Sequence, residues 1–187
     1  MFGLENIFTL APSFRAEKSR TRRHLTEFWH AEVESAWLHN HQMMELEEGM
    51  IEHILKEVLS SNRVELEFLG RDVSVLENIK APFDKMKYEE VLDKLNSRGF
   101  DLSWGDDFGY KEEKALTQEL KTPLYITNFP KEKGFYHRPD PNDPKSLVCH
   151  DLLAPEGYGE IIGGGERVRS TDELVERIRE ELSLIHI

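Results

Sequence analysis

Basic residues crowd one short segment near the start of this sequence. Five of the nine positions from Arg15 to Arg23 are Arg or Lys, although the 187-residue chain has a formal net charge of -12. Like charges at this spacing repel one another, so a bound anion would stabilise the segment. The guanidinium group of Arg presents a planar fork of donors that matches phosphate oxygens. A nucleotide triphosphate is therefore the candidate ligand, and a solvated basic turn is the alternative.

Acidic residues follow among glycines later in the chain. Asp151 lies on a strand expected at 146–153, and Glu160 lies on the next short strand, between glycines at 157, 159 and 163–165. So many glycines indicate close approach of the backbone to a ligand or to another chain, with a flexible loop as the alternative. The two carboxylates could share a Mg²⁺ ion, and Arg167 could pair with a substrate carboxylate. Each residue alone is more often structural, but together they indicate activation of a carboxylic acid by ATP and Mg²⁺.

A β-hairpin is expected to carry the basic segment. Residues 4–16 are predicted as its first strand, interrupted at Pro12 and Ser13, and residues 26–36 as its second, with the polar loop 18–23 as the tip. The alternation of the second strand places Phe28, His30 and Glu32 on one face, together with Glu34. This pattern is typical of the wall of a site or of a half-exposed strand with a wet face. The residues predicted to be hidden on the other face are Trp29, Ala31 and Val33.

Helical periodicity is clearest at 42–60, where an apolar stripe is predicted to be core. Shorter helices are expected at 87–96, 111–120 and 171–182, and a strand at 123–129, whereas 63–80 has a mixed pattern. The Pro-rich loop at 130–145 is long enough to be functional or mobile. His39 and His41 have no further metal ligand at a suitable spacing, so we expect them at the surface. The stripe comprises Met43, Met44, Met50, Ile51, Ile54, Leu55, Val58 and Leu59.

The composition fits one globular domain, with 39% hydrophobic and 32% charged residues. No apolar run approaches the roughly 20 residues needed to span a bilayer, and the first residues lack the features of a signal peptide. The single Cys149 excludes an intrachain disulfide and fits a reducing compartment, so a cytoplasmic location is expected. The acidic balance argues against a general nucleic-acid coat.

The motifs resemble those of the class II aminoacyl-tRNA synthetases. Residues 14–17 together with 23–32 resemble motif 2 of that class, and within it the aspartyl/asparaginyl branch. Residues 135–141 and 151–164 look most like the asparaginyl-tRNA synthetases, and the resemblance covers about residues 3 to 181. It implies an α+β fold in which an antiparallel β-sheet is flanked by helices.

The resemblance implies roles for the hairpin in binding ATP. Arg15 would hold the α-phosphate and contact the substrate carboxylate, and it is the expected catalytic residue. Glu17 would position ATP or the end of the tRNA. Arg23 and His24 would meet the outer phosphates. Phe28 would stack on adenine, and Leu25 would complete the ATP-binding set of the hairpin.

The resemblance also assigns the amino-acid and metal sites. Glu32 and Arg167 match positions that bind the amino acid. Asp151 and Glu160 match the carboxylates that hold Mg²⁺ and ATP, and Gly163 lies where the backbone passes the nucleotide. The implied activity is ATP-dependent ligation of asparagine to its tRNA through an aminoacyl-adenylate, by a homodimer with no membrane association.

Three alternatives to this activity stay open on the sequence. They are an aspartate–tRNA ligase, a synthetase-like asparagine synthetase that needs no tRNA, and a non-catalytic paralogue that binds tRNA. The expected domain is one partial catalytic domain over 1–187, with motif 2 at about 7–36 and no anticodon-binding domain, motif 1 or motif 3. We therefore expect truncation at both ends, a non-native segment at 183–187 and no activity of this chain alone.

Overall fold

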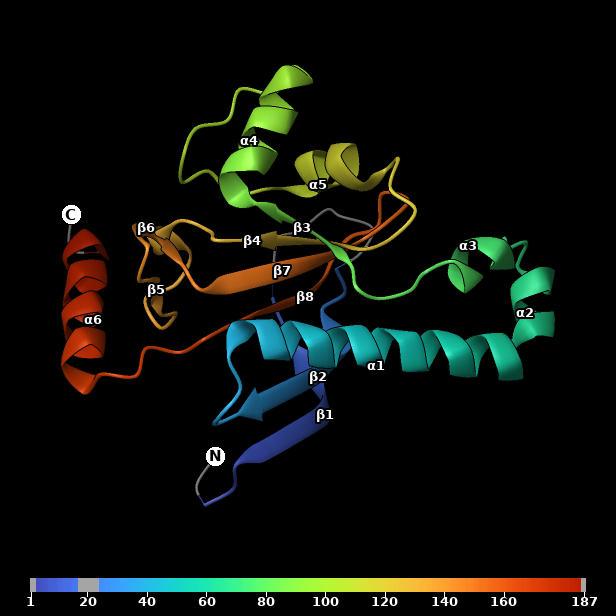
Figure 1. Ribbon diagram of the computed structural model, residues 1–187, viewed down its shortest axis with the longest axis horizontal. Coiled ribbons are helices and arrows are strands. Elements are labelled where there is room, and N and C mark those ends of the chain that lie inside the picture. The colour runs from blue at the N-terminus through green and yellow to red at the C-terminus, as the bar shows by residue number, and fades with distance from the viewer. Residues whose placement is uncertain (1–2, 17–23, 186–187) are drawn as a thin grey trace. The chain divides into compact units, whose positions relative to one another are not determined.

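The computed structural model describes residues 3–16 and 24–185, with side chains as far as 181. It divides into two compact units, Met1–His39 and Asn40–Ile187, each of which is described by itself. Helices and strands are labelled in Figure 1.

The first unit is a β-hairpin, as predicted. β1 (Asn6–Phe14) pairs antiparallel with β2 (Glu27–Ser35) in unbroken register. One further bond, from the Arg15 amide to the Thr26 carbonyl at 2.9 Å, extends the ladder toward the basic loop. At Pro12 and Ser13, where a bend or an edge is expected, both residues keep their partners on β2, so β1 is an edge strand without a break. A two-stranded sheet has only edge strands, and an edge tolerates the missing N–H of proline.

The second unit contains a four-stranded sheet in the order β3-β4-β7-β8. Its strands are β3 (Asp84–Lys87), β4 (Leu124–Thr127), β7 (Cys149–Ala154) and β8 (Gly159–Gly165). β4, β7 and β8 run antiparallel, whereas β3 and β4 are parallel. A parallel pair requires a long crossover, and the helices α4 (Tyr88–Ser97) and α5 (Tyr110–Thr117) provide it. The predicted α+β fold is confirmed, with this one parallel pair at its edge.

Helices cover both faces of this sheet (Figure 1). α4 and α5 lie on one face and contribute Val91, Leu95 and Leu116 to a core shared with Ile126 and Leu153. α1 (Asn40–Ser61) runs along the other face. The smaller elements are α2 (Arg63–Phe68), α3 (Val73–Glu77), the short 3-10 helix η1 (Lys131–Lys133), the paired strands β5 (Pro139–Asp140) and β6 (Asp143–Leu147), and α6 (Thr171–Ile185).

Only part of the apolar stripe of α1 is core. Met44 is buried with Tyr125 and Leu152 of the sheet, and Ile51 and Leu55 pack against the same cluster. Met50 and Ile54 each precede one of these packed residues by one position, and they remain 38% and 47% exposed. The prediction of a fully buried stripe is therefore wrong for these residues. The buried face instead includes Glu47 and Glu48, which accept hydrogen bonds from buried donors.

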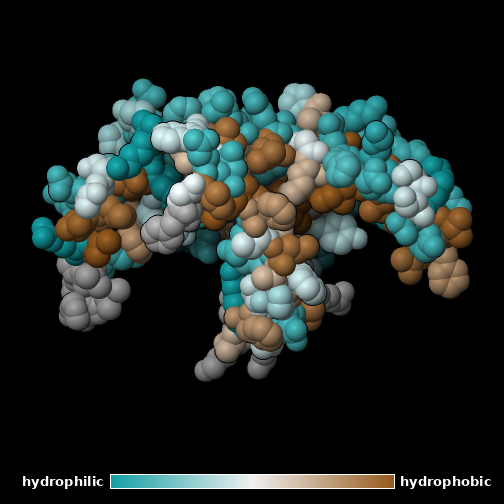
Figure 2. All heavy atoms as spheres, turned by 90° about the horizontal axis from the view of Figure 1, so that it is seen from below, coloured by the Kyte–Doolittle hydropathy of each residue, from teal (hydrophilic) through white to brown (hydrophobic). Residues whose placement is uncertain are grey.

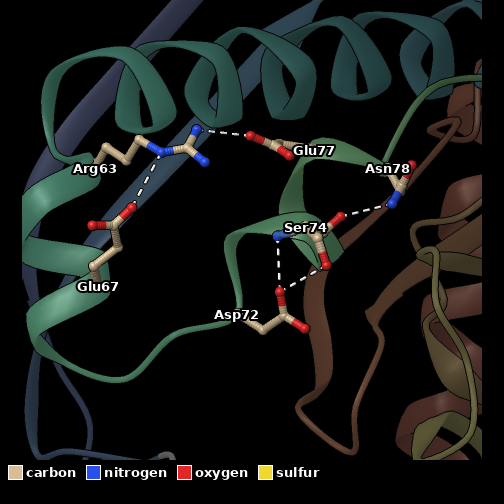
Figure 3. A network of polar contacts seen from close by, with 6 residues as sticks. All are labelled: Arg63, Glu67, Asp72, Ser74, Glu77 and Asn78. Carbon is tan, nitrogen blue, oxygen red and sulfur yellow. Dashed lines mark hydrogen bonds and ion pairs between the residues drawn. The ribbon is translucent and has the colours of Figure 1, made fainter.

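A polar network organises the segment at 63–80, whose pattern was mixed (Figure 3). Asp72 caps α3 by accepting hydrogen bonds from the amide and hydroxyl of Ser74 at 2.9 and 2.7 Å, and these bonds lower the pKa of Asp72. Arg63 joins α2 to α3 by reaching Glu77 at 2.8 Å. Because these contacts are exposed, each stabilises the segment only slightly.

Apolar side chains are exposed on α2 and just beyond it. Figure 2 shows hydrophobic surface at the end of the molecule where Figure 1 places α2. The exposed residues there are Val64, Phe68 and Leu69. Among the described helices, none combines the length and the apolar character that a membrane crossing requires.

Candidate functional site

One face of the hairpin carries Arg15, Phe28 and Glu32, three of the residues predicted to bind ATP or the amino acid. The guanidinium carbon of Arg15 lies 5.4 Å from the centre of the Phe28 ring. The Phe28 and His30 rings are 5.7 Å apart. Glu32 continues the same face, where His30 Nδ1 lies 3.8 Å from its carboxylate and the Thr9 hydroxyl donates to it at 3.4 Å. The predicted alternation of Phe28, His30 and Glu32 is therefore confirmed.

The opposite face of the hairpin differs from its prediction. Trp29 is 71% exposed and Val33 is 45% exposed, and Ala31 is also exposed, so these side chains are not hidden. The physical reason is that a two-stranded sheet is a single layer and cannot bury either face within itself. His24 and Leu25 are exposed and precede the second strand. The predicted residues Glu17 and Arg23, and the loop 18–23, lie outside the described residues.

The carboxylates of Asp151 and Glu160 converge above the backbone of Gly163. Asp151 pairs with Gly163 across β7 and β8. A Cβ atom added to Gly163 would lie 3.1 Å from Glu160 Oε1 and 3.3 Å from Asp151 Oδ1. Both oxygens therefore border a space that any side chain at 163 would fill. The backbone amide of Glu160 donates to Glu113 of α5 at 3.0 Å, which holds β8 against that helix.

A lysine outside the predicted site residues completes this group. Lys133, at the end of η1, forms an ion pair with Asp151 Oδ2. Its ammonium also lies 3.5 Å from the centre of the Phe129 ring. Burial raises the pKa of the Asp151 carboxyl above its ordinary value, and the Lys133 charge opposes that rise. The neighbouring Cys149 is buried, which raises the pKa of its thiol to about 11.

The segment that carries Lys133 is fixed by α6. The guanidinium of Arg177 donates to the carbonyls of Lys131 at 2.9 Å and of His137 at 3.0 Å, with a weaker contact to Gly134 at 3.3 Å. The loop expected at 130–145 is thus ordered by η1, by the β5–β6 pair and by one arginine. The only signal for Lys133 in the sequence was its position in this loop, since no spacing rule relates it to Asp151.

Arg167 and His137 border the far end of β8. The guanidinium of Arg167 lies 4.6 Å from the centre of the Tyr136 ring, and residues 137 and 167 form a β-bridge. His137 is buried against Gly165, where an added Cβ would lie 2.6 Å from His137 Nδ1. That nitrogen has no hydrogen-bond partner among the described residues. Burial, followed by the nearby charges of Arg167 and Lys133, lowers the pKa of His137 to about 4.

A second polar group lies on the opposite face of the sheet. His150 is fully buried, and its Nε2 lies 3.0 Å from both carboxylate oxygens of Glu47 on α1. Its Nδ1 lies 2.8 Å from Asn40 Oδ1. The Tyr125 hydroxyl donates to the Met44 carbonyl at 3.0 Å and to Glu47 at 3.2 Å. Successive side chains of a strand point to opposite faces of the sheet, so His150 and Asp151 lie on opposite faces of β7. The network therefore holds β7 from the face opposite Asp151.

The donor chemistry at Gly163 fits a hard divalent cation. Two carboxylates, with an open space between their oxygens, are what Mg²⁺ takes from a protein when substrate phosphates provide the remaining ligands. Among the described residues, no three His, Cys, Asp or Glu side chains gather into a fuller metal site. The expected surface positions of His39 and His41 are confirmed.

The hairpin residues and the sheet residues would have to meet in one site for the expected chemistry, and this convergence is a prediction. The hairpin with Arg15 belongs to one unit, and the sheet with Asp151, Glu160 and Arg167 belongs to the other. Within the second unit, the structure brings Asp151, Glu160 and Gly163 together and adds Lys133 to them. Arg167 lies beyond the end of β8 with Tyr136.

Fold and sequence together define the class of protein. Residues 1–184 match the family described as tRNA synthetases class II (D, K and N), and the chain belongs to this family. It is 52% identical over 181 residues to the asparagine–tRNA ligase of Thermoplasma acidophilum, an alignment that covers 96% of this chain and 42% of that protein. It is 48% identical over 182 residues to the asparagine–tRNA ligase of Pyrococcus abyssi, covering 97% of this chain and 42% of that protein.

A solved structure shares the fold over most of the chain. The asparaginyl-tRNA synthetase of Pyrococcus horikoshii, crystallised in complex with asparaginyl-adenylate, superposes with a TM-score of 0.92 at 48% identity. The match covers 96% of this chain and 42% of that one. The chain therefore spans about two fifths of the length of the relatives it matches.

Proposed function

We propose that this chain forms part of the catalytic domain of an asparagine–tRNA ligase. The observation that carries the proposal is its likeness, at 48% identity and a TM-score of 0.92, to a synthetase that binds asparaginyl-adenylate. The carboxylate pair above Gly163 and the Arg15–Phe28 face of the hairpin support it, because each has the chemistry that one part of ATP needs.

The hairpin residues divide the recognition of ATP among them. Phe28 stacks on adenine, and Arg15 places its guanidinium on the α-phosphate and the substrate carboxylate. Arg23 and His24 contact the outer phosphates. Glu17 positions ATP or the tRNA end, and Leu25 completes this wall.

The sheet residues bind the metal and the amino acid. Asp151 and Glu160 hold Mg²⁺, which would neutralise charge on the phosphates. Gly163 leaves room for the nucleotide, because any side chain there would meet both carboxylates. Glu32 of the hairpin reads the head of the amino acid, and Arg167 pairs with the amino acid.

The reaction then proceeds in two transfers. The carboxylate of asparagine attacks the α-phosphorus in line, a new O–P bond forms, and pyrophosphate leaves with the electrons of the broken P–O bond. A terminal ribose hydroxyl of tRNA next takes the asparaginyl group and releases AMP. Arg15 stabilises the charge that develops on the α-phosphate, so positioning and electrostatics account for the activation step without a protein base.

The cellular setting follows from this activity. We place the protein in the cytoplasm, where tRNA is charged and where its single thiol, Cys149, stays reduced. The whole protein acts as a homodimer with tRNA and asparagine as its substrates.

Amino-acid-dependent exchange of pyrophosphate into ATP tests the proposal. The sample is a chimera in which this chain replaces the matched segment of the Thermoplasma acidophilum enzyme, and the unaltered enzyme is the reference. We expect asparagine to drive exchange, and Arg15→Ala to lower its rate on the order of 10²-fold or more, the scale measured for other electrostatic stabilisers. Arg63→Ala, an exposed arginine on α2, is the matched control and should leave the rate unchanged.

Each alternative has its own outcome in the same assay. Exchange driven by aspartate would indicate an aspartate–tRNA ligase. Formation of free asparagine from ammonia without tRNA would indicate a synthetase-like asparagine synthetase. ATP binding with no exchange would indicate a non-catalytic relative, and a near-normal rate in Arg15→Ala would refute the role given to Arg15.

A further inference from the structure

We propose that Lys133 is a positioning residue that competes with the divalent cation for Asp151. Its ammonium holds the carboxylate when no metal is bound and leaves it when the metal binds. The inference rests on the proposed metal role of Asp151 and Glu160, and it concerns a residue to which the sequence motifs assign no role.

The two carboxylate oxygens of Asp151 have different neighbours. Oδ2 forms the ion pair with Lys133, whereas Oδ1 borders the space above Gly163 that Glu160 also borders. The ammonium and a cation held in that space would therefore share a single carboxylate. A cation of charge +2 so close to an ammonium is repelled by it, and burial strengthens that repulsion.

The buried carboxylate of Asp151 requires a positively charged partner. Its side chain is 10% exposed, and a buried carboxylate without a counter-charge is strongly destabilising. Lys133 meets that need while the metal is absent. A bound metal would take over the same task, after which the lysine is no longer needed there.

Lys133 can leave Asp151 without moving its backbone. Its side chain is 29% exposed, so the ammonium can reach water by rotation of its own flexible stem. Arg177 fixes the backbone of the segment around η1 through carbonyl oxygens alone, so the side chain can move while its anchor stays in place.

The test measures binding of Mn²⁺, used alone as a probe for Mg²⁺, to the 187-residue chain by calorimetry. We expect Lys133→Met to bind Mn²⁺ on the order of tenfold more tightly than the unaltered chain. A neighbouring positive charge changes the proton affinity of a carboxylate by about tenfold or more, and we expect an effect of the same order on its affinity for a metal ion. Lys133→Arg keeps the charge and should keep the weaker affinity. Lys131→Met, an exposed lysine on the same short helix, is the matched control and should bind as the unaltered chain does.

A second measurement guards against a folding defect. Because Lys133→Met leaves Asp151 without its counter-charge, the metal-free variant should melt at a lower temperature, and saturating Mn²⁺ should raise its melting temperature more than that of the unaltered chain. Equal or weaker Mn²⁺ affinity in a folded Lys133→Met variant would overturn the proposal, since a lysine that merely orients Asp151 would assist the metal.

Glu160→Gln separates this proposal from the proposed function. If Mn²⁺ binding depends on Glu160 but ignores Lys133, the metal site stands and the competition is refuted. If binding to the Lys133→Met variant is absent or does not depend on Glu160, the metal assignment fails and the competition fails with it.

Discussion

At the scale of single residues, three consecutive glycines in β8 have three different neighbours. A Cβ at Gly163 would meet the carboxylate oxygens of Glu160 and Asp151. One at Gly164 would meet the His150 ring at 2.9 Å, and one at Gly165 would meet the Cys149 Cβ atom at 2.7 Å. The sequence predicted the close approach of a ligand or chain to these glycines. It could not say which glycine borders the site and which only permits packing, because that depends on which side chain of β7 lies opposite each one.

Alanine substitutions should therefore separate a site glycine from a packing glycine. Gly165→Ala should lower the free energy of unfolding by about 1–3 kcal/mol, because a ring and a Cβ atom cannot move aside in a packed interior. Gly163→Ala should stay within about 1 kcal/mol of the unaltered chain, since carboxylate ends can shift and a strand favours alanine over glycine. The same Gly163→Ala change should weaken Mn²⁺ binding. Urea unfolding and calorimetry measure the two effects, and equal destabilisation by both substitutions would contradict this distinction.

His137 should make stability depend on pH. Its pKa is about 4 in the folded chain against an ordinary value of 6.5, so between these values the unfolded chain binds the extra proton. The free energy of unfolding is therefore not reduced by this group above about pH 6.5, and it decreases as the pH falls from 6.5 toward 4. Between pH 7 and pH 4 this ring should lower the free energy of unfolding of the unaltered chain by about 2–3 kcal/mol. The variant His137→Met, with an uncharged side chain of similar size, should not show this decrease. Parallel pH profiles for the two proteins would show that the ring is not held neutral by the fold.

At the scale of elements, the hairpin and the longer helices were predictable because local pattern determines them. The four-stranded sheet was implied only by the family resemblance, and its edge strand β3 was not predicted. The alternation in β2 and the periodicity of α4 each repeat over several residues and need no distant partner. α1 shows where such reasoning stops. It has apolar residues on two adjacent stripes, and only packing against β4 and β7 decides that Met44 is buried while Ile54 is exposed. The ion pair between Lys133 and Asp151 was equally out of reach, since it joins a loop to a strand through a contact that no periodicity encodes.

The carboxylate of Glu47 should be a main contact between α1 and the sheet. Glu47→Ala leaves Nε2 of the buried His150 ring without its partner and removes one of the two acceptors of the Tyr125 hydroxyl, so we expect a loss of about 2–4 kcal/mol in the free energy of unfolding. Glu45→Ala, on the exposed side of the same helix, should change it by less than about 0.5 kcal/mol. Urea unfolding monitored by circular dichroism measures both, and similar small effects would indicate that α1 is held by its apolar contacts alone.

At the scale of the whole molecule, the proposed activity requires residues from both units. The hairpin supplies a guanidinium beside an aromatic ring, and the sheet supplies two carboxylates above a glycine. Neither half alone can position ATP against an amino acid, since in-line attack requires both substrates to be held within about 3–3.5 Å of each other. The membership of the chain in the class II family accounts for why both halves occur in one sequence.

A crystal structure of the chimera with Mg²⁺ and a non-hydrolysable ATP analogue tests this requirement most directly. We expect Arg15 to contact the α-phosphate, Phe28 to stack on the adenine, and Asp151 and Glu160 to hold the metal within one cleft. A structure in which Arg15 and Glu160 lie on opposite sides of the protein, with the nucleotide bound by neither or by only one of them, would contradict this expectation.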